Sequence, residues 1–307
     1  MLARPLIALM LLTAAPLAQA AVASLDLSTY TLTRTIPIGA SMLQNGSESS
    51  AITYNRDRGT LFVIDDEGVA ISQFTRQGAF VDRMRLSGFG VAATGDPEGL
   101  TYIGNNQFVI AAERALTLYR VTYDPATTPD RTALPNAVLA TPAVGNIGIE
   151  GVSYDPRDGS FVTVKEKTPA QVNRNVVTFG TPGSNVLTSL FDPTGLGTLD
   201  LADVQVLSTV AVPGSALADQ LLIFSQESKK LLHTTRAGEV LGMFDFALIS
   251  ASAEGVTIDE NGVIYVTDET PNIYVLEPGA AVVPVPGAWA LMASGLFLLG
   301  VMRRRRS

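Results

Sequence analysis

Alternating apolar and polar residues recur along the chain in pairs of short runs, each pair joined by a polar turn. At 253–269, AEGVTIDENGVIYVTDE, two such runs flank Asn261-Gly262, a dipeptide typical of β-hairpins. Similar hairpins occur in GDPEGLTYIGNNQFVIAAER and GIEGVSYDPRDGSFVTVKEK, with turns at 104–106 and 155–159. No window holds sustained 3.6-residue spacing. The pattern therefore predicts an all-β chain and excludes a helical solenoid.

The hairpins repeat with a nearly constant period. Each begins with an acidic residue, and these residues stand at positions 48, 98, 150, 203 and 254, which are 50, 52, 53 and 51 residues apart. A period near 50 that is filled with short strands and turns is typical of propeller blades, each a four-stranded antiparallel sheet. The sequence therefore predicts a five-bladed β-propeller. The fourth unit, around 203–227, is a degraded copy with a longer turn.

The last blade is one strand short, because the chain after its third strand (272–276) continues into Glu277-Pro278-Gly279 and the tail. The segment 29–38, TYTLTRTIPI, precedes the first blade without a partner and has the length and alternation of a strand. We expect it to complete the fifth blade, which would close the ring and remove two exposed sheet edges.

The two ends of the 307-residue chain differ from the repeats in composition. Residues 1–20 have one early charge, Arg4, an apolar run and Ala18-Gln19-Ala20, which is the form of a secretory signal peptide. Residues 281–307 form a tail in which no charge occurs from 282 to 302 and Arg303–Arg306 follow. This is typical of a short transmembrane helix with its arginine cluster on the cytoplasmic side before any processing. The propeller would occupy 21–280.

The tail, with Val-Pro-Val-Pro at 283–286, resembles a PEP-CTERM sorting signal. That resemblance implies an exported protein at the cell membrane, on its periplasmic face or at the cell surface, and an exosortase as the processing enzyme. The family usually has glutamate between the two prolines, where this chain has Val285. Retention by an uncleaved C-terminal helix is the alternative.

The net charge of the propeller limits the classes of partner that it can bind, and the lack of cysteine limits the ways in which it can be stabilised. Without Arg4 and the four tail arginines, five positive charges in all, the formal net charge changes from −8 to −13 over residues 21–283. An acidic exported domain argues against nucleic acid and favours cations as partners. The chain has no cysteine, so packing or a metal ion must stabilise it in place of disulfides.

The geometry of a propeller predicts where the acidic residues meet. The residue before the first strand of a blade and the residue after the second emerge on one face, near the axis. Ten carboxylates would then converge at one mouth. The inner set, our candidate metal ligands, is Glu48, Glu98, Glu150, Asp203 and Glu254, and a second set beside it is Asp66, Glu113, Glu166, Glu227 and Glu269.

Crowded carboxylates raise one another's pKa unless a cation compensates them. Ca²⁺ fits best, because it accepts six to eight oxygen ligands in loose geometry. Zinc is disfavoured by the lack of cysteine and the single histidine, His233. A solvated acidic rim, partly neutralised by Lys165, Lys167 and Lys229, remains the alternative to a metal site.

The Glu-Gly-(Leu/Val)-x-Tyr strands, the Lys-Glu-Lys after the third hairpin and Ala-Glu-Gly-Val-Thr-Ile-Asp-Glu-Asn-Gly resemble the SdiA-regulated propeller family over residues 40–278. The resemblance implies five blades with calcium near the axis, and it defines no activity. Two functions stay open. The first is a non-enzymatic calcium-binding module for an extracytoplasmic ligand, favoured because no nucleophile–base pair is found. The second is a calcium-dependent hydrolase of phosphoesters, lactones or glycosides, with its site at the mouth.

Overall fold

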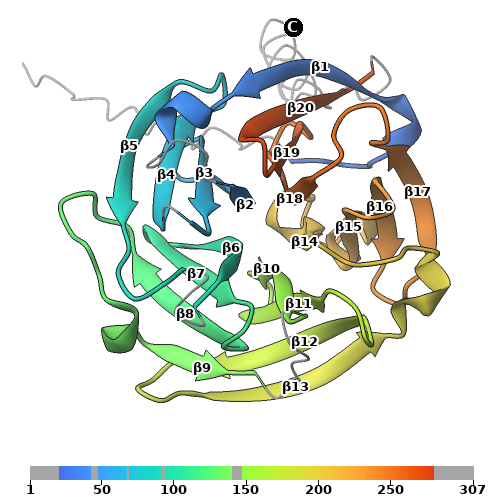
Figure 1. Cartoon of the computed structure of the whole chain (residues 1–307). Coiled ribbons are helices and arrows are strands. Elements are labelled where there is room, and N and C mark those ends of the chain that lie inside the picture. The colour runs from blue at the N-terminus through green and yellow to red at the C-terminus, as the bar shows by residue number, and fades with distance from the viewer. Residues whose placement is uncertain (1–20, 43–47, 68, 91–94, 140–146, 280–307) are drawn as a thin grey trace, which may run out of the picture. The chain divides into compact units, whose positions relative to one another are not determined.

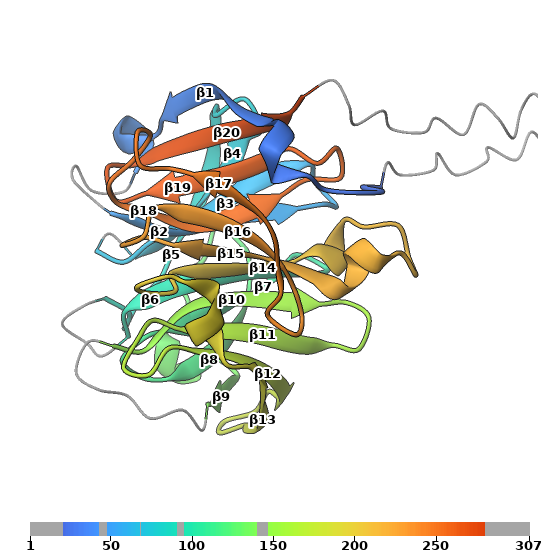
Figure 2. The same cartoon turned by 90° about the vertical axis from the view of Figure 1, so that its right-hand side faces the viewer.

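The repeated hairpins form five antiparallel sheets of four strands each, arranged around a common axis (Figure 1). The computed structural model describes residues 21–42, 48–67, 69–90, 95–139 and 147–279. Within these ranges the structure confirms the predicted five-bladed propeller. Figure 1 and Figure 2 both place β1 (Tyr30–Pro37) and β20 (Asn272–Pro278) on the side of the ring opposite β12 (Gln171–Thr178) and β13 (Ser184–Phe191).

Each blade is given from its innermost to its outermost strand. Blade 1 consists of β2 (Ser49–Asn55), β3 (Thr60–Asp65), β4 (Ala70–Thr75) and β5 (Phe80–Arg85). Blade 2 consists of β6 (Pro97–Gly104), β7 (Gln107–Ala112), β8 (Thr117–Thr122) and β9 (Asn136–Val138). Blade 3 consists of β10 (Ile149–Asp155), β11 (Ser160–Lys165), β12 (Gln171–Thr178) and β13 (Ser184–Phe191). Blade 4 consists of β14 (Asp203–Val206), β15 (Gln220–Ser225), β16 (Lys230–Thr235) and β17 (Val240–Asp245). Blade 5 consists of β18 (Ala253–Ile258), β19 (Ile264–Asp268), β20 (Asn272–Pro278) and β1 (Tyr30–Pro37).

Short 3-10 helices occupy several connections. They are η1 (Leu27–Thr29), η2 (Gly39–Ser41), η4 (Arg131–Ala133), η5 (Pro193–Leu196), η6 (Leu207–Thr209) and η7 (Ala216–Asp219). The long connection between β14 and β15 contains η6 and η7, and it accounts for the degraded appearance of the fourth repeat.

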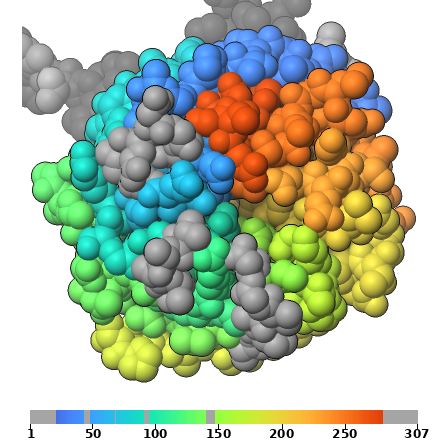
Figure 3. Space-filling model, viewed as in Figure 1, coloured from blue at the N-terminus to red at the C-terminus, as the bar shows by residue number. Residues whose placement is uncertain are grey.

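The N-terminal strand closes the ring. β1 pairs antiparallel with β20 from Tyr30 opposite Pro278 to Pro37 opposite Asn272. The Tyr30 hydroxyl also donates a hydrogen bond of 2.7 Å to the carbonyl oxygen of Gly262, in the hairpin turn of blade 5. This confirms the prediction for the segment 29–38. In the surface view the first and last parts of the propeller adjoin at the top (Figure 3).

Apolar side chains fill the spaces between neighbouring blades. Between blades 1 and 2, for example, the rings of Phe62 and Phe108 lie 4.6 Å apart, and Tyr123 meets Phe62 edge-on at 4.9 Å. All three side chains are buried. Because each sheet packs both its faces on neighbours, the blades are held as one ring around the axis.

Near the axis, a polar side chain at the same place in every innermost strand joins each blade to the next. In four blades a hydroxyl oxygen accepts the backbone N–H of the neighbouring innermost strand at 2.9–3.2 Å, and in blade 4 a glutamine oxygen accepts the hydroxyl of Thr257 at 3.1 Å. We call this ring the axial latch. It consists of Thr53, Thr101, Ser153, Gln205 and Thr257.

The predicted targeting segments cannot be followed in this fold. Residues 1–20 and 280–307, where a signal peptide and a C-terminal helix were predicted, lie outside the described residues. Among the residues that the structure describes, no helix has the length and apolarity needed to cross a membrane.

Candidate functional site

A β-bulge begins the innermost strand of four blades. The pairing register shifts by one residue at Ser50, Glu98 and Glu150, and at Glu254 in blade 5. A bulge inserts one residue that has no partner in the ladder and redirects its side chain. These four side chains all line a cavity at one end of the axis.

The cavity has a volume of about 390 Å³ and is strongly acidic. Ten carboxyl groups and a single guanidinium, that of Arg114, line it together with Ser50 and Gln226. We call it the acidic mouth. Its carboxyl groups belong to Glu48, Asp66, Glu67, Asp96, Glu98, Glu113, Glu150, Glu166, Glu254 and Glu269.

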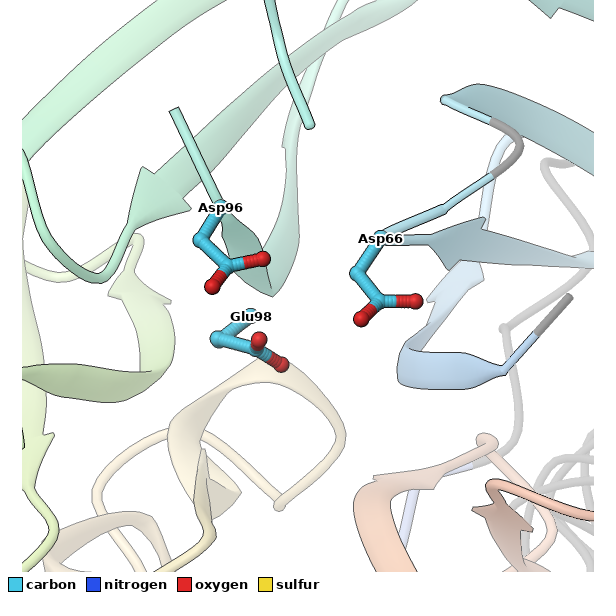
Figure 4. A group of neighbouring side chains, drawn as sticks. All are labelled: Asp66, Asp96 and Glu98. Atoms are coloured by element: carbon cyan, nitrogen blue, oxygen red, sulfur yellow. The ribbon is translucent and has the colours of Figure 1, made fainter. Parts of the chain in front are cut away.

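Three of these carboxyl groups form a tight cluster between blades 1 and 2. Asp66 follows β3, Asp96 precedes β6, and Glu98 is the bulge residue of β6; one oxygen from each lies within 4.8 Å of the other two. Figure 4 shows the three side chains converging on a common space. The Oδ1 atoms of Asp66 and Asp96 are buried and have no hydrogen-bond partner. Unsatisfied buried oxygens are costly, and a cation between them would satisfy them.

Burial and mutual repulsion raise the pKa values of the carboxyl groups in the mouth. Burial is the largest cause at Asp66, whose pKa rises to about 7, with the charges of Asp96 and Glu48 adding to it. Burial likewise raises the pKa of Glu113 to about 7. The pKa values of three bulge residues are raised well above the usual range by burial and then by neighbouring carboxylates; these residues are Glu98, Glu150 and Glu254.

A second cluster lies between blades 2 and 3, but its members already have partners. Oxygens of Glu113, Glu150 and Glu166 lie within 4.8 Å of one another. Glu113 accepts the N–H of Gly148 at 3.1 Å, and the ammonium group of Lys167 lies 2.6 Å from Glu166. Asp96 also has a partner, since the guanidinium of Arg114 lies 2.9 Å from its Oδ2. Of the two clusters, however, only that of Asp66, Asp96 and Glu98 has buried oxygens without a hydrogen-bond partner, which makes it the better candidate for a bound cation.

Blade 4 departs from the other blades and from the predicted inner set. No bulge precedes its first strand, so Asp203 pairs with Phe224 and occupies the place of Gly99, Gly151 and Gly255. Its buried carboxyl group accepts the N–H groups of Val204 and Val256, at 2.7 and 2.8 Å, and does not line the mouth. The structure therefore places Asp203 in an inter-blade contact outside the lining of the mouth, to which the other four predicted residues belong.

Two further positions differ from the predicted sets by their register. In blade 1 the bulge position is held by Ser50, and Glu48 lines the mouth two residues earlier, at the place that Asp96 has in blade 2. In blade 4 the residue after the second strand that lines the mouth is Gln226, while the adjacent Glu227 binds Lys167 at 2.7 Å. The other members of the second set all line the mouth, namely Asp66, Glu113, Glu166 and Glu269.

The single histidine does not belong to the mouth. His233 lies in β16, where its Nε2 is 2.7 Å from Oε1 of Gln220 in β15, and burial lowers its pKa to about 4. Lys165, which was considered as a neutralising charge, already has hydrogen-bond partners. Its ammonium group donates to the backbone carbonyl oxygens of Lys167, Thr168 and Pro169.

Comparisons with known proteins agree with this fold. A model of the SdiA-regulated family matches residues 28–277. Glutaminyl cyclase from Myxococcus xanthus is 13% identical, with a TM-score of 0.51 over 81% of this chain and 95% of the cyclase. Virginiamycin B lyase from Staphylococcus aureus is 16% identical, with a TM-score of 0.41 over 74% of this chain. The chain spans 65% of the length of that lyase. At these identities the cyclase shares the fold alone.

Proposed function

Because this chain belongs to the SdiA-regulated family and gathers ten carboxyl groups around one axial mouth, we propose that it is a calcium-binding interaction module of the cell envelope. The observation that carries this proposal is the pair of buried, unpartnered Oδ1 atoms on Asp66 and Asp96, which lie beside Glu98. A divalent cation among these three residues would gain ligands and remove their repulsion.

The ligand chemistry favours calcium over other metals. The cluster offers only oxygen atoms, which are the ligands that hard cations take. The mouth has many more oxygens than the six of a magnesium octahedron and leaves room for water or a ligand group. The carboxylates of Glu150 in blade 3 and Glu254 in blade 5 would add to the negative electrostatic potential around the ion. Zinc sites in proteins are built mainly from cysteine and histidine, and this chain has no cysteine and a single histidine that lies elsewhere.

Calorimetric titration of residues 21–279 with CaCl₂ tests the proposal. We expect binding in the wild type, and a 10- to 100-fold weaker affinity in Asp66→Asn and Asp96→Asn, because each removes one charged ligand. Asp203→Asn is the matched control, since it makes the same change on a buried aspartate outside the mouth. Absence of heat and of any change in melting temperature with calcium would refute calcium binding, and equal affinities in all three variants would refute this ligand set.

We propose further that the module works outside the cytoplasm. The support is the sequence of residues 1–20 and 281–307, which has the form of a signal peptide followed by a sorting tail. The partners would be the membrane, an exosortase acting on the tail, and an extracytoplasmic ligand at the mouth. Fractionation of cells that produce the full chain, with and without residues 281–307, tests this; recovery of both forms in the cytoplasm would refute it.

A calcium-dependent hydrolase is the second candidate, because two carboxyl groups of the mouth have pKa values near neutrality. A general base works best when its pKa lies near the working pH. Glu113, with a pKa of about 7, stands beside the proposed ion rather than within its ligand cluster. A panel of phosphoester, lactone and glycoside substrates with calcium present tests this function. Turnover that is lost in Glu113→Gln would support it, and the absence of turnover throughout would leave the binding module alone.

A further inference from the structure

One position of the mouth carries an amide where the other four blades carry a carboxyl group. In the register of the blades, Gln226 follows β15 at the place where Asp66, Glu113, Glu166 and Glu269 follow the second strands of their own blades. Blade 4 also lacks an acid at the bulge position, where Ala202 stands. At the bulge position blade 1 also lacks an acid, because it has Ser50 there. Only the ring of carboxyl groups that follow the second strands is therefore interrupted at blade 4 alone.

The amide of Gln226 is held by the two carboxyl groups of blade 5. Its Nε2 donates to Oε1 of Glu254 at 2.9 Å and to Oε1 of Glu269 at 3.0 Å. An amide NH₂ group has two donors, and here each donor is directed at one carboxyl oxygen of this pair. Its backbone is fixed as well, because the N–H of Gln226 donates to Oδ2 of Asp200 at 3.1 Å. The two donors thus satisfy oxygens that would otherwise be available to a cation.

The interruption of the acidic ring results from the amide group of Gln226 and not from the length of its side chain. Gln226 has the length of a glutamate, and its side chain already reaches both Glu254 and Glu269. A carboxyl group in the same place would bring three acidic side chains together in one sector of the mouth. That arrangement would match the cluster of Asp66, Asp96 and Glu98 between blades 1 and 2.

We propose that Gln226 is a specificity-determining residue that limits the number of cations in the mouth. Its amide takes the place of a cation between Glu254 and Glu269 and confines metal binding to the carboxyl groups of blades 1 to 3. The inference rests on the proposed calcium binding. It adds that the mouth binds one cation fewer than an uninterrupted ring of acids would bind.

The test is the calcium stoichiometry of Gln226→Glu, measured by calorimetry and by equilibrium dialysis of residues 21–279. We expect one additional equivalent of Ca²⁺ relative to the wild type, with the original equivalent retained. Gln77→Glu is the matched control, because it adds the same charge to an exposed turn outside the mouth, and it should leave the stoichiometry unchanged. The double variant Gln226→Glu/Glu269→Gln should lose the additional equivalent and keep the first.

The outcomes separate this inference from the proposed function. If the wild type binds calcium and Gln226→Glu binds the same number of ions, the inference is overturned and the proposed function stands. If the wild type binds no calcium, both are overturned. If Gln226→Glu unfolds in EDTA, its stoichiometry is measured on protein refolded in calcium; an additional equivalent there supports the inference, and an unchanged number or a failure to refold overturns it.

Discussion

Replacing Asp66 with asparagine should stabilise the calcium-free domain at neutral pH, although it removes a proposed ligand. Burial and the charges of Asp96 and Glu48 raise the pKa of Asp66 from 3.8 to about 7 in the folded state. The folded protein therefore binds a proton more tightly than the unfolded chain does. Stability from this group is complete below pH 4 and is lost as the pH rises through 7.

The size of the effect follows from the shift. About three pKa units correspond to about 4 kcal/mol at 1.36 kcal/mol per unit. This is an upper limit, because neighbouring carboxyl groups in the mouth share protons with Asp66 and take up part of the change. Asparagine has nearly the same shape and no charge. In EDTA at pH 8 we therefore expect Asp66→Asn to unfold with a free energy up to about 4 kcal/mol higher than that of the wild type.

Urea unfolding of residues 21–279 at pH 4, 6 and 8 measures this difference. The difference between the free energies of unfolding of the variant and the wild type should fall to within about 0.5 kcal/mol at pH 4. At that pH the side chain at position 66 is neutral in both folded proteins. Saturating calcium at pH 8 should narrow the gap by about 1.4–2.7 kcal/mol, because a 10- to 100-fold tighter affinity stabilises the wild type by that much more than the variant. A variant that is less stable than the wild type in EDTA at pH 8, or a gap that does not change with pH, would refute the reasoning.

Three further predictions concern the scaffold of the mouth. Thr257→Val should lower the free energy of unfolding by about 1–3 kcal/mol in denaturant titrations, because it leaves the N–H of Tyr54 buried without an acceptor; an unchanged midpoint would contradict the role of the axial latch. Gly151→Ala should cost about 1–3 kcal/mol, because its Cβ would lie 2.6 Å from the Cα of Asp203, whereas Gly195→Ala meets nothing within 4 Å and should be nearly neutral. Deleting residues 30–37 should expose the edge of β20 and give oligomers in size-exclusion chromatography; a monomer with unchanged melting temperature would show that closure by β1 is dispensable.

The sequence predicted the fold well because the blades are copies of one another. Regular spacing of the hairpins gives the number of blades, and the missing last strand together with the spare segment at 29–38 gives the closure by β1. Glu98, Glu150 and Glu254 were predicted correctly as residues at the mouth, since each stands before the glycine of a repeated Glu-Gly pair. A repeated local pattern can be recognised in the sequence without knowing how the blades pack against one another.

The errors in the candidate site come from shifts of one or two residues. A bulge lengthens the innermost strand by one residue in four blades and is absent from blade 4, so an alignment on the nearest acid chose Asp203 in place of Ala202. The same alignment error of one residue assigned Glu227, and not Gln226, to the mouth. A shift of one residue is decisive because it turns a side chain to the other face of a strand. Alignment on the axial latch, with Thr53 opposite Thr101, would have placed Ser50 at the bulge and exposed Asp96 as a partner of Glu48.

The axial latch also decides how the mouth can be used. Its side chains tie the innermost strands to one another, and the small cavity of about 20 Å³ that three of its threonines line has room for about one water molecule. In the described residues, that cavity and the acidic mouth share no lining residue. The mouth and this cavity are therefore separate spaces, and a ligand that enters the mouth meets the carboxyl groups without passing the axial latch.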